Sequence, residues 1–105
     1  MTPPDRGEVW IVDLGMAGKV RPCLILSLPA DPQDRALVTL VAHTTGVRGS
    51  RFEVPVSAWF LHGSGAVDAQ NLLTVPLARL IRRLGLLPPD QFAQVEDAVR
   101  RWLGL

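Results

Sequence analysis

Hydrophobic positions form three nearly continuous runs in the first half of the chain, at residues 8–14, 22–28 and 36–43. Apolar residues at odd and even positions alike are typical of strands that are buried on both faces of a sheet. Segment 29–32, with two prolines and an aspartate, is a turn signal between the last two runs. The pattern therefore predicts three central strands.

A different pattern follows in residues 51–56, where Phe52, Val54 and Val56 occupy every second position. Period two predicts a strand with one buried face. Pro55 has no N–H to donate to a neighbouring strand, so we expect this strand at an edge of the sheet.

The last part of the chain is predicted to end in a helix. Two short extended pieces near residues 65–68 and 72–75 and a helical turn at 77–81 come first. After Pro89 the apolar residues recur with the 3.6-residue period of a helix that docks on a sheet. This stripe consists of Phe92, Val95, Val99, Trp102 and Leu103. Asp90 at its start and arginines at its end suit the helix dipole.

Composition narrows the class of protein. A chain of 105 residues with 48% hydrophobic residues can bury one core, so we expect a single mainly β (α+β) domain over residues 1–105. No apolar run approaches the roughly 18 residues of a membrane span, and no signal segment is recognisable. The lone Cys23 lies in an apolar run and is expected to be a packed thiol in a reducing compartment. A cytoplasmic protein without a membrane partner is the expectation.

The net charge of +1 hides an uneven distribution of charge. Residues 35–89 contain six arginines and only two carboxylates, and ten of the eleven basic residues of the chain are arginine. The arginine side chain is preferred for bidentate phosphate contacts. Two histidines and one cysteine, with scattered carboxylates, show no metal-ligand spacing. We therefore predict an anionic partner and neither a metal nor another cofactor.

Arg21 is the first candidate for chemistry because Pro22 follows it. Proline keeps the preceding residue out of the α region, so Arg21 must be extended. A strand tolerates proline as its first residue or at an edge, which predicts that regular structure begins here. A charged fork held on rigid backbone suits the binding of a phosphate.

Several short motifs together resemble the MazF/PemK toxins of type II toxin–antitoxin systems. They are Gly7–Leu14, Arg21–Pro22, Val41–Thr45, Asp68–Gln70, Leu80–Gly85 and the closing helix that ends in Leu103–Leu105. The resemblance implies a small, strongly curved SH3-like/CcdB-like β-barrel with a C-terminal helix, acting as a homodimer. It also implies metal-independent, sequence-selective cleavage of single-stranded RNA, which inhibits translation and growth and is restrained by a cognate antitoxin.

The resemblance carries over residue by residue. It makes Arg21 and Thr44 the catalytic pair, with Thr45 as the alternative threonine, and it places the amide of Gln70 where a base edge could be read. In such a reaction the ribose 2′-hydroxyl attacks the phosphorus, and the enzyme aligns the attack and stabilises charge on the phosphoryl oxygens. An arginine side chain stays charged at ordinary pH, so Arg21 is expected to hold the phosphate and not to act as the base.

The RNA groove is expected to be lined by cations from the basic middle of the chain. Lys19 precedes the Arg21 strand, and Arg48 and Arg51 flank the loop after Thr44. His43 titrates in a useful range and is a further RNA-binding candidate, although alternation along a strand points it away from the face of Thr44. Trp59 and Phe52 are candidates for stacking on a base, and the alternation of Phe52 with polar residues favours a core position for it.

Two alternative functions remain open at the level of the sequence. One is a CcdB-like DNA gyrase poison, because residues 101–105 resemble the C-terminal end of that family. The other is a non-catalytic SH3-like protein-interaction module, although such grooves are normally rich in aromatic residues and this chain has no tyrosine. The apolar segments 72–73 and 77–87 exceed what one short helix can hide, which predicts a dimer.

Overall fold

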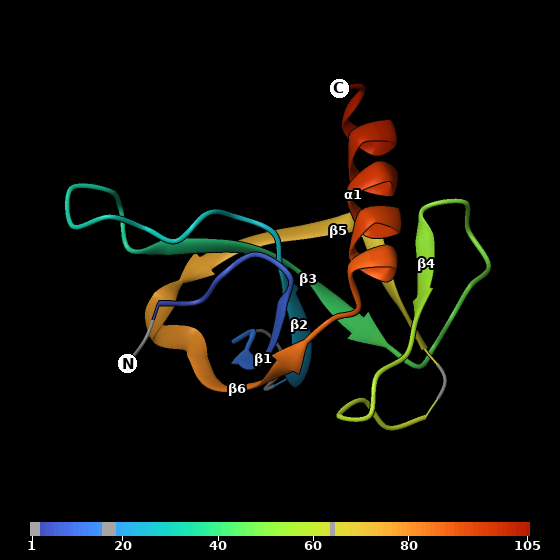
Figure 1. Cartoon of the computed structure of the whole chain (residues 1–105), viewed down its shortest axis with the longest axis horizontal. Coiled ribbons are helices and arrows are strands. Elements are labelled where there is room, and N and C mark those ends of the chain that lie inside the picture. Colours follow the sequence, from blue (N-terminus) through green and yellow to red (C-terminus); the bar gives the residue numbers. More distant parts are fainter. Residues whose placement is uncertain (1–2, 16–18, 64) are drawn as a thin grey trace.

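The computed structural model describes residues 3–15, 19–63 and 65–105 and contains six strands and one long helix (Figure 1). The strands alternate with turns, and the helix closes the chain. The elements are β1 (Glu8–Asp13), β2 (Val20–Ile25), β3 (Leu37–Thr44), β4 (Glu53–Val56), β5 (Gly65–Pro76), a 3₁₀ turn (Leu77–Arg79), β6 (Leu80–Leu86) and α1 (Pro89–Leu103). Within these residues no helix has the length and apolar character needed to span a membrane.

The strands form one antiparallel sheet in the order β4-β5-β3-β2-β1-β6. The three apolar runs are its central strands β1, β2 and β3, and the strand with Pro55 is the edge strand β4, as the pattern predicts. The mainly β fold with a C-terminal helix is confirmed. The predicted barrel is open in the described part of the chain, because β4 and β6 are left as the two edges of the sheet.

Pro22 is not the first residue of its strand, contrary to the prediction. β2 begins at Val20, and Pro22 pairs with Ile11 of β1. The other neighbour, β3, pairs with β2 only from Cys23 onward. Pro22 therefore lies in a central strand but has a partner strand on one side only, so its missing N–H removes no bond of the β2–β3 ladder.

Two pieces predicted as separate are one long strand. Residues 65–68 pair with β4, and residues 72–76 pair with β3, within the single strand β5. The register of β5 against β3 shifts between Val41 and His43, which is an irregularity that bends the strand at residues 69–71. The two extended pieces are thus correct, and the bend between them hides their continuity in the sequence.

The helical turn predicted at 77–81 is a 3₁₀ turn at Leu77–Arg79, and the segment after it is the strand β6. The prediction missed this strand. Ile81, Arg82 and Arg83 are all exposed, so β6 lacks the period-two alternation of a half-buried strand. Its pairing with β1 is also interrupted by two shifts of register.

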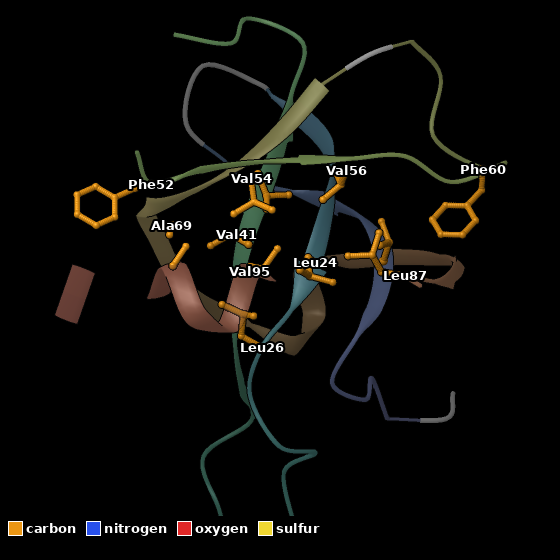
Figure 2. Close-up of a cluster of buried hydrophobic side chains, with 13 residues drawn as sticks. Leu24, Leu26, Val41, Phe52, Val54, Val56, Phe60, Ala69, Leu87 and Val95 are labelled. Carbon is orange, nitrogen blue, oxygen red and sulfur yellow. The ribbon is translucent and has the colours of Figure 1, made fainter. Parts of the chain in front are cut away.

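Two hydrophobic cores explain why the central strands are apolar at every position. One core lies between the sheet and α1 and extends from Phe52 to Phe60, with Val41, Leu24 and Val95 between them (Figure 2). The second core lies on the other face of the sheet. It consists of Trp10, Val12, Cys23, Ile25, Val38, Leu40, Ala42 and Leu80.

Helix α1 packs against β4 and β5. Val95 and Ala98 are fully buried, whereas Trp102 and Leu103 of the predicted stripe are 43% and 50% exposed. The C-terminal turns extend past the sheet, as Figure 1 shows, so the stripe is longer than the surface that covers it. Gly104 ends the helix in the left-handed conformation with φ 73°.

Candidate functional site

Arg21 and Thr44 come from neighbouring strands and meet at one end of the sheet. The ladder of β2 and β3 ends with Cys23 opposite Ala42, and the same register extended two residues beyond it would bring Arg21 beside Thr44. Opposite residues of an antiparallel pair share one face. Both residues line a cavity of about 710 Å³ and also a second one of about 360 Å³. The pair is therefore common to both cavities.

The larger cavity combines positive charge with aromatic surface. Arg21 and Arg82 contribute guanidinium groups, and Trp59, His62 and His43 contribute rings. Apolar side chains of β1, β2, β6 and the loop after β4 also line it. None of the described residues that line it is Asp or Glu, so the cavity favours an anionic or aromatic ligand.

The smaller cavity is more polar. Besides the shared pair it is lined by Arg48, Glu53, Asp68 and Asn71, together with Ala42 and Gly46. The Thr44 Oγ1 accepts a hydrogen bond from the Gly46 N–H at 3.0 Å. Because that bond uses a lone pair of the oxygen, the Thr44 hydroxyl hydrogen stays available to donate to a ligand oxygen.

The loop that carries Arg48 is organised by one carboxylate. Glu53 accepts hydrogen bonds from the backbone N–H groups of Arg48 and Ser50, the latter at 2.7 Å. These backbone hydrogen bonds lower the pKa of Glu53 below its usual value. The carboxylate therefore stays ionised and holds the loop that presents Arg48 to the smaller cavity.

His43 is the one buried polar residue of the described core, at 7% exposure. Its Nε2 has no hydrogen-bond partner within the described residues. Burial lowers the pKa of His43, because desolvation penalises the charged imidazolium. The ring is therefore neutral at pH 7.

Cys23 does not contribute a reactive group. Its side chain is fully buried, and burial raises the pKa of the thiol to about 12 even though the charge of Arg21 opposes this. A neutral, inaccessible thiol is a poor nucleophile. Cys23 packs in the second core, which is the role expected from the sequence.

The structure brings together five of the eight residues predicted for the site. Arg21, Thr44, Thr45, His43 and Arg48 all line one of the two cavities. In this part of β3, His43 lines the same cavity as Thr44, although alternation predicts opposite faces. The strand ends there beside a shift of register between Val41 and His43, which interrupts the simple alternation.

Three predicted RNA-binding residues lie elsewhere. Lys19 and Gln70 are exposed and line neither cavity. Arg51 lines a separate cavity, and its guanidinium lies 4.6 Å from the centre of the Phe52 ring. Asn71, next to Gln70 in the chain, is the amide that faces the smaller cavity.

The sequence analysis assigned no role at the site to the charged and amide lining residues Arg82, Glu53, Asp68 and Asn71. Arg82 was hidden by the missed strand β6. The backbone N–H of Gln70 donates to the Asp68 Oδ1 at 3.0 Å, so the turn of the chain there sets which amide points inward. In the sequence, only the aspartate in the Asp–Ala–Gln–Asn order indicates such a turn.

The described residues contain no cluster of three or more metal-ligating side chains. The hydrogen-bond donors at the site are instead guanidinium groups, a hydroxyl and imidazole nitrogens. Such a set binds a phosphate and stabilises negative charge that develops on its oxygens.

Comparison with known protein families gives one decisive match. The model of the family described as PemK-like, MazF-like toxin of type II toxin-antitoxin system matches residues 5–103. The chain belongs to the PemK/MazF-like toxin family. Arg21, Thr44 and both cavities lie within the matched residues of this toxin.

Individual relatives agree with the family assignment. The toxin is 33% identical to the endoribonuclease MazF3 of Mycobacterium tuberculosis over 89 residues, which cover 84% of this chain and 86% of that protein. Its fold is similar to a mycobacterial endoribonuclease in complex with its cognate antitoxin, with a TM-score of 0.83, 32% identity and coverage of 97% and 96% of the two chains. It is also similar to the MazE–MazF complex of Deinococcus radiodurans, with a TM-score of 0.82, 27% identity and coverage of 100% and 99%.

Proposed function

We propose that Arg21 and Thr44 form the centre at which this toxin cleaves single-stranded RNA. As a member of the PemK/MazF-like family with endoribonucleases among its relatives, the chain is an endoribonuclease toxin of a type II toxin–antitoxin system. The observation that supports the proposed centre is the shared position of Arg21 and Thr44 in both cavities. An RNA strand whose scissile phosphate lies at Arg21 and Thr44 extends into one cavity on each side.

The reaction needs no protein nucleophile and no metal. The ribose 2′-oxygen attacks the phosphorus and loses its proton, the bond from phosphorus to the 5′-oxygen breaks, and that oxygen takes up a proton. The products are a 2′,3′-cyclic phosphate and a 5′-hydroxyl. Arg21 holds the non-bridging oxygens by charge, and the Thr44 hydroxyl donates to one of them; a single preorganised donor of this kind contributes about 3 kcal/mol.

The partners follow from the family. A cognate antitoxin binds the toxin and restrains it, as in the antitoxin complexes among the structural relatives. The toxin acts on mRNA at a short sequence in the cytoplasm, as a homodimer of single-domain chains, and so stops translation and growth. Exposed apolar side chains at the end of α1, including Trp102 and Leu105, are consistent with an assembly that covers them.

The test is incubation of the purified toxin with defined single-stranded RNA in EDTA, followed by analysis of the end groups. We expect cyclic phosphate and 5′-hydroxyl ends from the wild type, and a loss of about 100-fold to 1000-fold in cleavage rate for Arg21→Ala and for Thr44→Ala. Thr44→Ser keeps the hydroxyl and serves as the conservative control. Parallel reactions with Thr45→Ala decide between the two threonines.

Intact RNA at high enzyme excess would contradict the cleavage reaction. A block of supercoiling by DNA gyrase under the same conditions would favour the gyrase-poison alternative, and binding of a protein without either effect would favour the interaction module. Equal cleavage by the wild type and Arg21→Ala would contradict the proposed catalytic centre but not the endoribonuclease activity.

A further inference from the structure

Trp59 is a large apolar side chain that the fold leaves uncovered. It is 87% exposed and lines the larger cavity together with Arg21 and Thr44. A single exposed apolar residue is common on protein surfaces, but this one lies at the wall of a cavity, where its ring is available to a ligand. Trp59 is therefore a largely exposed ring beside the proposed catalytic centre.

The loop that carries Trp59 is held in place from two sides. The Ser57 N–H donates to the Gln91 Oε1 at 2.8 Å, and the Gln91 side-chain amide donates back to the Ser57 carbonyl at 3.0 Å, which ties the loop to α1. A backbone hydrogen bond from Leu61 to Ala58, at 2.9 Å, closes the turn around Trp59.

Phe60 anchors the same loop in the main core. Figure 2 shows its ring beside Leu87, and it is only 9% exposed. The ring packs so close to Gly85 that a Cβ there would lie 2.5 Å from it. Trp59 meets Phe60 edge to face, with ring centres 5.6 Å apart and an angle of 86° between the planes. The exposed indole thus stands on a buried support and needs little ordering when a ligand binds.

Charge and size define the ligand of this cavity. Arg82 of β6 and Arg21 of β2 both line it, and no carboxylate does so among the described residues. Its volume of about 710 Å³ falls in the range of small-molecule sites, about 300–1,000 Å³. An aromatic platform next to two guanidinium groups matches a nucleotide, whose base stacks and whose phosphate is anionic.

We propose that the larger cavity holds the nucleobase that adjoins the scissile phosphate, and that Trp59 stacks on this base. The inference rests on the proposed function, because the phosphate is placed at Arg21 and Thr44. Stacking fixes the sugar that follows the base, so Trp59 is a substrate-binding residue that also orients the attacking or leaving ribose. His62 and Thr45 line the same cavity and offer donors to the edge of the base.

The test removes the base and the ring separately. RNA that the wild type cleaves is compared with the same RNA carrying an abasic ribose on the 5′ or the 3′ side of the cleaved bond. Wild type, Trp59→Ala and Trp59→Phe are assayed on all three substrates, and Leu28→Ala, at a residue 75% exposed that lines neither cavity, is the matched control.

Stacking predicts that Trp59→Ala lowers kcat/KM on intact RNA by about tenfold to a hundredfold. The same change has little effect on the substrate that lacks the stacked base, because the interaction is already gone. Trp59→Phe retains most of the activity. An equal loss on intact RNA and on both abasic substrates would overturn the proposal, as would no loss at all, which would assign the exposed ring to a protein partner.

A binding measurement separates this inference from the cleavage reaction. RNA with 2′-fluoro ribose throughout cannot be cleaved, and its dissociation constant is measured for wild type and Trp59→Ala. A rise of about tenfold for the variant supports stacking even if the wild type cleaves nothing. An unchanged dissociation constant beside normal cleavage by the wild type overturns stacking and leaves the proposed function standing.

Discussion

The Glu53 carboxylate accepts two hydrogen bonds from the backbone N–H of Arg48, at 3.0 and 3.1 Å. One acidic side chain thereby positions the loop whose arginine faces the smaller cavity. The hydrogen bonds of Glu53 go to backbone N–H groups, so the Arg48 side chain keeps its own donors for a phosphate.

Glu53→Ala is expected to raise the KM for RNA by about fivefold with little change in kcat, because Arg48 loses its position in the free enzyme. The measurement is steady-state cleavage of a defined RNA. Asp97→Asn, which removes an exposed carboxylate on α1, is the matched control for net charge. Loss of a negative charge by itself favours RNA binding. A KM that is raised in Glu53→Ala but not in the control therefore shows that Glu53 positions Arg48. Equal KM values in the two variants would contradict this role.

Arg48 and Arg51 form a natural pair of variants because they lie three residues apart but line different cavities. Arg48→Ala is expected to weaken RNA binding and to reduce the slope of log K against log salt by about one phosphate contact, about 0.7 for a single strand. Arg51→Ala leaves the slope unchanged, since its guanidinium lies over Phe52. Binding titrations at several salt concentrations test this. A reduced slope for Arg51→Ala would place the RNA at the cavity that Arg51 lines.

His43 predicts a pH dependence of stability. Burial lowers its pKa below the usual 6.5, so the unfolded chain binds the proton at a higher pH than the folded one. The wild type should therefore lose stability as pH falls below 6.5, down to the lowered pKa, and show no such loss above 6.5. Denaturant unfolding of wild type and His43→Gln, compared at about pH 8 and about pH 5, isolates this contribution. An identical pH dependence for both proteins would exclude it.

Gly65 is predicted to be essential for the packing around the site. A Cβ on Gly65 would lie 2.5 Å from the His43 Nε2 and 2.6 Å from the Thr44 carbonyl oxygen. Gly65→Ala should therefore destabilise the fold by about 1–3 kcal/mol and lower cleavage, since Thr44 must shift. Thermal unfolding and cleavage rates are the measurements.

Gly46→Ala is the matched control for that substitution. A Cβ on Gly46 meets only the Thr44 Oγ1, at 3.6 Å, which is ordinary contact. Its N–H, which donates to Thr44, is kept. We expect stability within about 1 kcal/mol of the wild type; comparable damage from both substitutions would show that the neighbourhood of Gly65 is not specially tight.

Much of the fold was predictable from local pattern. The central strands were recognisable because burial on both faces leaves almost no polar position in them, and α1 because its period of 3.6 is sustained. β6 and the continuity of β5 were not, because both strands carry irregular registers and exposed side chains that interrupt any period. Regular patterns identify regular elements only.

The site divides in the same way. Arg21 and Thr44 could be selected in advance, since the proline after Arg21 constrains its backbone and the family resemblance supplies the threonine. That Asn71 lines the smaller cavity and Gln70 does not depends on the turn at Asp68, and that Arg48 lines it depends on the hydrogen bonds of Glu53. Adjacent residues of similar chemistry are separated only by the direction in which the backbone turns them.

By itself the sequence determined the class of fold and the family and selected Arg21 and Thr44 as the proposed pair, because each rests on residue types and spacing within short stretches. Only the tertiary structure decided what surrounds the pair. Trp59, Arg82 and His43 come from three distant segments, and they share one cavity because the loop after β4 is tied to α1 and β6 pairs with β1. Such long-range contacts depend on packing across the whole chain, and no local pattern records them.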